Sequence, residues 1–206
     1  MNKTLLILIP FLALAFLTNC SARKTTPTPN PLTTDIGVTI NGITWATRNV
    51  DAPGTFTTNP EDAGMFFQWN RRKGWSAIDR YVEGWDSSMP EGTAWYAEND
   101  PCPEGWRVPT YEELKTLVYV DSEWTTRNGV RGSLFGVAPY QMFLPAVGVR
   151  IFNNSEHLFR HTHGIYWSST VGYRRTAERL TFNSGIRHMG INNRANGLSI
   201  RCVKIK

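Results

Sequence analysis

Apolar residues recur along this chain in short groups rather than in long helical stripes. Residues 65–69 (MFFQW), 143–148 (FLPAVG) and 166–170 (YWSST) are brief, strongly apolar or aromatic runs. Runs of this length, bounded by turn residues, predict buried β-strands. Residues 177–182 alternate apolar and polar positions, which is typical of an antiparallel strand with one exposed face. The pattern predicts a fold of short strands joined by long loops.

Two further strand signals lie at the ends of this region. Residues 38–45 are two β-prone segments around Asn41-Gly42, which predicts a hairpin with a two-residue turn. Residues 198–205 form a last apolar segment, and we expect them to be one continuous strand.

One helix has a clear start. Thr110 and Glu113 have the spacing of a capping box, in which each side chain bonds the other residue's backbone N–H. Leu114, Leu117 and Val118 follow at helical spacing and supply a buried stripe. With the strands, this predicts an α+β domain with one or two helices.

The N-terminus is expected to be an export signal. A basic start precedes the apolar run 4–17 (TLLILIPFLALAFL), which is too short for a typical transmembrane helix. The run ends in Leu17-Thr18-Asn19-Cys20, which resembles a bacterial lipobox. We therefore expect residues 1–19 to be a signal peptide and Cys20 to be lipidated. The alternative is ordinary cleavage nearby, which leaves Cys20 free.

Residues 20–36 follow as a flexible tether, because threonines and prolines dominate and large apolar residues are scarce. The folded domain is then expected over 37–206. Lipidation at Cys20 predicts a cell-envelope protein that is anchored in the outer membrane. The residues after Cys20, Ser21-Ala22-Arg23-Lys24, are basic, so both the periplasmic and the surface face stay open.

Net charge and cysteine content bear on which partners and which disulfide we expect. The net charge is +5, but lysines and arginines do not cluster among aromatic residues, so nucleic acid is not an expected partner. With Cys20 acylated, Cys102 and Cys202 remain. An even pair in an oxidising compartment predicts one disulfide, and two buried thiols are the alternative.

Several segments, in this order, resemble the Fibrobacter succinogenes major paralogous domain family. They are VTINGITWATRNV, NPEDAGMFFQWNRRKGW, DPCPEGWRVPTYEEL, FLPAVG, YWSST, AERLTF and GLSIRCVK. That family is similar in fold to C-type lectins and to the formylglycine-generating enzyme. The resemblance implies a C-type-lectin-like domain with short antiparallel strands, and it also supports the Cys102–Cys202 bridge.

The segment FNSGIRHMGINNRANGLSIRCVK is similar to the variable tail of lectin-fold proteins diversified by retroelements. A randomised AAC codon in such a tail never yields Met, Glu, Lys, Gln or Trp. Residues 171–175, 187, 188, 190 and 191 fit that rule, whereas Glu178 and Met189 do not.

The resemblance implies a display surface at the C-terminal end, with irregular polar and aromatic residues held on regular strands. Aromatic and arginine side chains are typical of binding hot spots. The alternative is an ordinary solvated face. The display surface consists of Tyr173, Arg174, Arg175, Arg179, Arg187, His188, Ile191 and Asn193. Trp167, Leu180 and Phe182 are expected in the core.

Other chemistry has weaker support. His157, His161 and His163 lie close in sequence, but only Glu156 adds a ligand, so a solvated loop is favoured over zinc. Residues 59–62 and 98–100 offer oxygen ligands for calcium and equally suit turns and caps. Ser168, Ser169 and Thr170 have no His and Asp fixed beside them by any motif. We expect no catalytic residues, no metal and no cofactor.

The sequence thus predicts a lipid-anchored recognition module that meets the membrane through its N-terminal lipid and binds a protein or glycan. Two alternatives stay open. One is an enzyme related to the formylglycine-generating type with altered chemistry. The other is a structural or pilus-associated envelope subunit.

Overall fold

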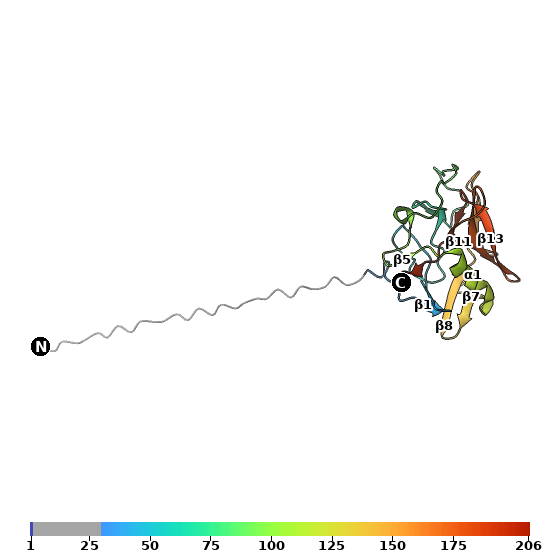
Figure 1. Cartoon of the computed structure of the whole chain (residues 1–206). Helices are drawn as coiled ribbons and strands as arrows, with labels where there is room; N and C mark the ends of the chain where they lie inside the picture. The colour runs from blue at the N-terminus through green and yellow to red at the C-terminus, as the bar shows by residue number, and fades with distance from the viewer. Residues whose placement is uncertain (2–29) are drawn as a thin grey trace.

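Short strands dominate the molecule because glycine, proline and asparagine interrupt every apolar run. A computed structural model describes Met1 and residues 30–206. The strands of these residues pair antiparallel in four small sheets, with a single α-helix (Figure 1). The helix α1 covers Tyr111–Tyr119, and a 3₁₀ turn covers Ala97–Asn99. The expectation of short antiparallel strands and long loops is confirmed, and the result is a small β-rich fold.

Two sheets bring distant parts of the chain together. The first has the order β1 (Val38–Ile40), β2 (Ile43–Trp45), β15 (Val203–Lys204) and β5 (Trp106–Arg107). The second has the order β10 (His157–Leu158), β9 (Val149–Arg150), β14 (Gly197–Leu198), β3 (Met65–Gln68) and β4 (Gly74–Ser76). Because β15 lies between β2 and β5, the end of the domain is fixed against its beginning.

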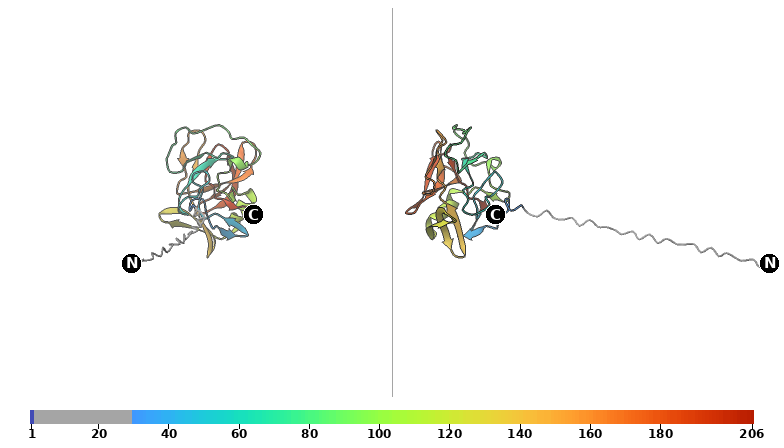
Figure 2. Two further views of the ribbon diagram at one scale, coloured as in Figure 1. Left: turned by 90° about the vertical axis from the view of Figure 1, so that its left-hand side faces the viewer. Right: turned by 180° about the vertical axis from the view of Figure 1, so that it is seen from behind.

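The other two sheets are built from neighbouring strands. One contains β6 (Ser122–Arg127), β7 (Val130–Val137) and β8 (Tyr140–Pro145). The other contains β11 (Gly164–Val171), β12 (Thr176–Phe182) and β13 (Arg187–Asn193). Figure 2 shows the sheet of β6, β7 and β8 at one end of the molecule and the loops between β4 and β5 at the other.

Both hairpins with an Asn-Gly turn have the backbone that such turns require. Asn41 and Gly42, between β1 and β2, have φ values of 50° and 75°, which confirms the predicted hairpin. Asn128 and Gly129, between β6 and β7, have φ values of 47° and 80°. The β6–β7 hairpin was not predicted, although its Asn-Gly pair gives the same signal.

The helix begins as its sequence predicts. The Thr110 hydroxyl accepts a hydrogen bond from the Glu113 backbone N–H at 3.3 Å, and the Glu113 carboxylate accepts one from the Thr110 N–H at 2.8 Å. Leu114 and Leu117 are buried, and Val118 is partly buried against the same cluster. The capping box and the apolar stripe are therefore confirmed.

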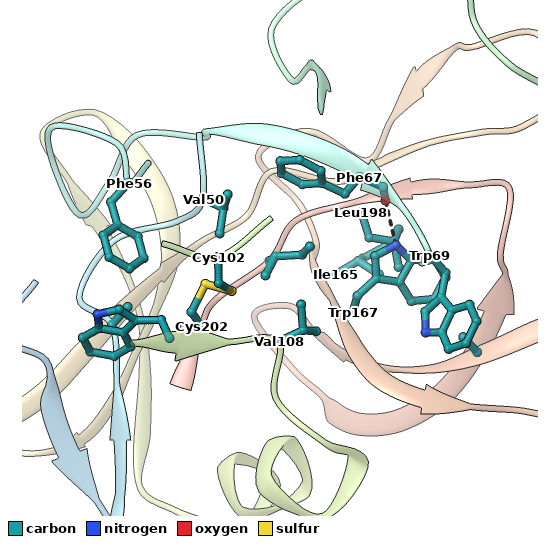
Figure 3. Packing of buried hydrophobic residues seen from close by; sticks show 14 of the residues in the cluster. Val50, Phe56, Phe67, Trp69, Cys102, Val108, Ile165, Trp167, Leu198 and Cys202 are labelled. Atoms are coloured by element: carbon teal, nitrogen blue, oxygen red, sulfur yellow. Dashed lines mark hydrogen bonds between the residues drawn. A yellow bond between two sulfur atoms is a disulfide. The ribbon is translucent and has the colours of Figure 1, made fainter. Parts of the chain in front are cut away.

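The core has two main clusters, on either side of the sheet of β11, β12 and β13. One surrounds the disulfide and includes Trp69, Trp167 and Ile200 (Figure 3). The other lies beneath α1 and includes Leu180 and Phe182. Trp167, Leu180 and Phe182 are fully buried, which confirms their assignment to the core.

Two predicted boundaries are wrong. Residues 198–205 are not one strand, since the chain leaves β14 after Leu198 and joins the other sheet only at Val203. The folded unit also includes part of the predicted tether. The Asp35 carboxylate accepts hydrogen bonds from the Thr47 backbone N–H at 3.0 Å and from Arg48 Nε at 3.2 Å. Threonine-rich sequence predicted a tether here, but the Asp35 carboxylate and the carbonyls of Pro31 and Leu32, which accept from Arg48 and from the Phe56 N–H, hold the segment on the domain.

Candidate recognition surface

Strand β12 is the centre of the candidate surface, because it pairs with β11 on one side and β13 on the other. The neighbouring strand β11 is tightly packed against the core. Trp167 Nε1 of β11 donates to the Phe67 carbonyl at 2.8 Å (Figure 3). A Cβ added to Gly164 would lie 2.0 Å from the Phe182 ring, so only glycine allows this close packing.

The loop between β11 and β12 presents three of the predicted display residues to solvent. Tyr173 is 71% exposed, and Arg174 and Arg175 are also exposed. The Arg174 guanidinium carbon lies 5.0 Å from the centroid of the Tyr173 ring, a cation–π contact. The Thr176 hydroxyl donates to the Tyr173 carbonyl at 2.5 Å, so the turn is tied to the start of β12.

Strand β13 divides the other display residues between two faces, because side chains alternate along a strand. Met189 packs on the cluster beneath α1, so Arg187, Ile191 and Asn193 share that face. Arg179 and His188 lie on the opposite face, where Arg179 of β12 pairs with Gly190 of β13 and His188 of β13 pairs with Thr181 of β12. The predicted residues therefore form two faces and a loop rather than one continuous surface.

Two of the display residues make bonds within the molecule. Arg187 Nη1 donates at 2.5 Å to the carbonyl of Val120, the C-cap of α1. A helix end leaves carbonyls unpaired and favours a cation. The Asn193 side chain accepts from the Ala195 N–H at 2.9 Å. Both side chains therefore have partners within the fold, whereas Ile191 is 49% exposed.

Arg194 supports the surface from beneath and was missed by the sequence reasoning. Its guanidinium carbon lies 4.4 Å from the Trp69 ring centroid. Its Nε donates to the Thr176 carbonyl at 3.0 Å and its Nη1 to the Gly92 carbonyl at 2.8 Å. Burial lowers the pKa of Arg194. Nothing in the local sequence distinguishes this arginine from the exposed ones nearby.

Arg201 holds the C-terminal segment in the core without any carboxylate. Its guanidinium donates to the Asn49 side chain at 2.8 and 3.1 Å and to the carbonyls of Ala46 and Phe143 at 3.1 Å. Burial lowers its pKa to about 10 and raises that of the neighbouring Tyr166 to about 12. Both groups serve the frame rather than the surface.

The predicted disulfide is present. Cys102 and Cys202 are bonded, with their Cα atoms 6.1 Å apart. Asp100 orders the segment that follows it, around Cys102 and β5, since its carboxylate accepts from the Cys102 N–H at 2.9 Å and the Val108 N–H at 3.0 Å. Burial raises the pKa of Asp100. Both oxygens of this calcium candidate thus bond the backbone, and neither domain cysteine is a free thiol.

The three neighbouring histidines do not converge. His157 Nε2 lies 2.6 Å from the Val147 carbonyl. His163 contacts the Thr162 hydroxyl at 3.0 Å and the Asn183 side chain at 3.3 Å. In the part of the chain that the structure describes, no three His, Cys, Asp or Glu residues lie close enough to hold a metal ion. Within the same residues, no helix has the length and apolarity to span a bilayer.

Cys20, the predicted lipidation site, lies outside the described residues, so the predicted anchor and signal peptide stay predictions. Comparison with known proteins gives no match: no family model, no curated protein and no solved structure is similar enough to this chain to place it in a family.

Proposed function

We propose that this protein is a cell-envelope recognition module that binds a protein or glycan through the end of the β11–β12–β13 sheet. The observation that supports it most is the contrast between frame and loop. Trp167 and Phe182 are fully buried, while Tyr173, Arg174 and Arg175 protrude from the adjoining loop. A rigid scaffold that presents exposed aromatic and arginine side chains is typical of binding surfaces.

We assign the domain to the C-type-lectin-like folds as part of this proposal. Support comes from the pairing of β2 with β15, which joins the first and last parts of the domain. The disulfide between residues 102 and 202 and the long loops between β4 and β5 are further support. The resemblance to the major paralogous domain family rests on the sequence motifs alone.

Anchoring at the outer membrane is the second part of the proposal and rests on the lipobox at Cys20. The enzyme alternative is less favoured, because the formylglycine-generating enzymes use reactive cysteines, whereas both cysteines of this domain are joined in a disulfide. A structural subunit would always pack against the same partner, whereas a recognition module with a diversified surface would bind a ligand that varies. A neighbouring reverse-transcriptase gene with a near-copy of the coding stretch for residues 166–204 would favour a variable ligand.

The decisive experiment compares two surface variants of the full chain on arrays of glycans and envelope proteins. One combines Tyr173→Ser, Arg174→Ser and Arg175→Ser, and the control combines Tyr140→Ser with Arg127→Ser, which are exposed elsewhere. We expect the first variant to lose the ligands that the wild type and the control retain, with melting temperatures unchanged. Ligands that both variants retain equally would contradict the proposed surface.

A further inference from the structure

Arg179, in the middle of β12, has an unusual environment for an arginine. It lies between Trp167 of β11 and Gly190 of β13 in the sheet register. A Cβ on Gly190 would lie 3.6 Å from Arg179 Cζ, so the guanidinium rests on the bare backbone of the edge strand. Its Nε and Nη1 atoms are buried, and no described residue accepts a hydrogen bond from them.

Arg179 as a whole is half-buried, whereas the fully buried arginines among the described residues all have hydrogen-bond partners. Arg150 and Arg194 donate to backbone carbonyls, and Arg201 donates to carbonyls and the Asn49 side chain. Burial without a partner is unfavourable for a charged group, and burial lowers the pKa of Arg179. Arg179 is therefore the exception among these arginines, because its buried Nε and Nη1 have no hydrogen-bond partner among the described residues and only the charge of Glu178 opposes the effect of burial.

The neighbouring side chains on the Arg179 face of the sheet, Trp167, Thr181 and His188, carry no carboxylate. Thr181 lies two residues along on the same face, and its hydroxyl is also buried without a partner. His188, opposite Thr181, is exposed. The nearest carboxylate in sequence, Glu178, belongs to the other face of the strand. Across 171–193 the chain has four arginines against this one glutamate, so the local potential attracts anions.

We infer that Arg179 is the binding point for a carboxylate of an acidic protein partner that docks across β13. The inference rests on the proposed recognition function and names its ligand chemistry. A guanidinium and a carboxylate match in shape and charge, and the guanidinium lies over Gly190 with no side chain between them. The hollows of the molecule that surround Tyr119 and Tyr140, or Arg160 and His161, lie at other residues. A strand face suits a protein surface better than it suits a sugar, which binds in concave sites.

The first test uses the full-length protein and an oligo-glutamate peptide as the probe, with the oligo-glutamine peptide as the neutral control. We expect Arg179→Gln to weaken oligo-glutamate binding about tenfold, as for a hot-spot arginine. Arg179→Lys should restore part of the affinity. The matched variant Arg127→Gln removes an exposed charge at the distant β6–β7 turn and should change binding less than about threefold. Equal losses for the two Gln variants would overturn the inference, because only general charge would be at work.

The second test separates binding from a structural role and from a glycan ligand. Arg179→Met should leave the melting temperature unchanged or raise it, because it removes an uncompensated charge; a clear loss of stability would show that Arg179 is structural. If heparin binds more strongly than oligo-glutamate, and this binding depends on Arg179, the ligand is an acidic glycan and not a protein.

If oligo-glutamate does not bind but the array ligands depend on Tyr173–Arg175, only this inference is wrong. If the wild type binds neither, the proposed function falls as well.

Discussion

Single side chains on the β11–β12–β13 sheet separate by burial into frame and surface. Trp167, Leu180 and Phe182 are fully buried, whereas Tyr173 is mostly exposed. Truncation of each of the three to Ala should therefore lower the free energy of unfolding by about 2 to 5 kcal/mol. Tyr173→Ala and Arg175→Ala should change it by about 0.5 kcal/mol or less. Urea unfolding of the five variants checks this, and a Tyr173→Ala loss as large as the core losses would contradict it.

Arg187 and His188 are sequence neighbours with different expected effects. Arg187 donates to the Val120 carbonyl at the end of α1 and lies over the Phe135 ring, so Arg187→Ala should destabilise the domain by about 1 kcal/mol. His188 is exposed on the other face, and His188→Ala should cost about 0.5 kcal/mol or less. Thermal melts of the pair give the answer. Equal effects would mean that Arg187 contributes no more to stability than an exposed side chain of β13 does.

The start of helix α1 depends on one carboxylate. Glu113 is partly buried, but its hydrogen bonds from Arg107 at 2.6 and 2.8 Å and from the Thr110 N–H at 2.8 Å outweigh that burial. The pKa of Glu113 is therefore lowered from its ordinary value of 4.5. A lowered carboxylate pKa adds stability above pH 4.5 that is lost as the pH falls through the folded-state value.

Glu113→Gln should thus lower stability by about 0.5 to 1 kcal/mol at neutral pH, the range of a partly exposed ion pair. The difference from the wild type should shrink as the pH falls below 4.5, because the wild-type carboxyl then becomes neutral as well. Chemical denaturation at a series of pH values measures this. A Gln variant whose deficit stays constant down to the acid limit would show that charge at Glu113 is irrelevant. Glu112→Gln, on an exposed side chain of the same turn, is the control.

At the scale of the whole molecule, the disulfide joins parts of the chain that are 100 residues apart. A bridge that closes so long a loop stabilises by about 4 to 5 kcal/mol in the chain-entropy view. The double variant Cys102→Ala/Cys202→Ala should lose up to this amount, measured by denaturation against the oxidised wild type. Mass mapping under non-reducing conditions should find the two cysteines linked. Two free thiols in protein exported by the native host would contradict the bridge.

The proposed lipid anchor would decide on which membrane the proposed recognition surface is held. Cys20→Ser should abolish acylation and release a soluble domain, because the lipid attaches only to the thiol. Metabolic labelling with a fatty acid, followed by fractionation, measures both effects. A variant that is still labelled would show that the lipobox interpretation is wrong.

Local signals in the sequence determined much of the frame. The Thr110–Glu113 capping box located α1, and Asn41-Gly42 located a hairpin, because both act within a few residues. Alternation predicted that Leu180 and Phe182 are buried. The β6–β7 hairpin was not predicted, although Asn128-Gly129 carries the same turn signal, because this pair lies among mixed polar residues.

The roles of the polar residues depend on contacts that form only in the folded domain. The period of two along β13 placed Arg187 and His188 on opposite faces, but it does not say which face α1 covers. Long arginine side chains find partners far away in sequence, as Arg201 does at Asn49 and Phe143, and Arg179 finds none among the described residues. Hydrophobic periodicity fixes where a strand lies, whereas the partner of a charged group depends on which backbone carbonyls the completed fold leaves within its reach.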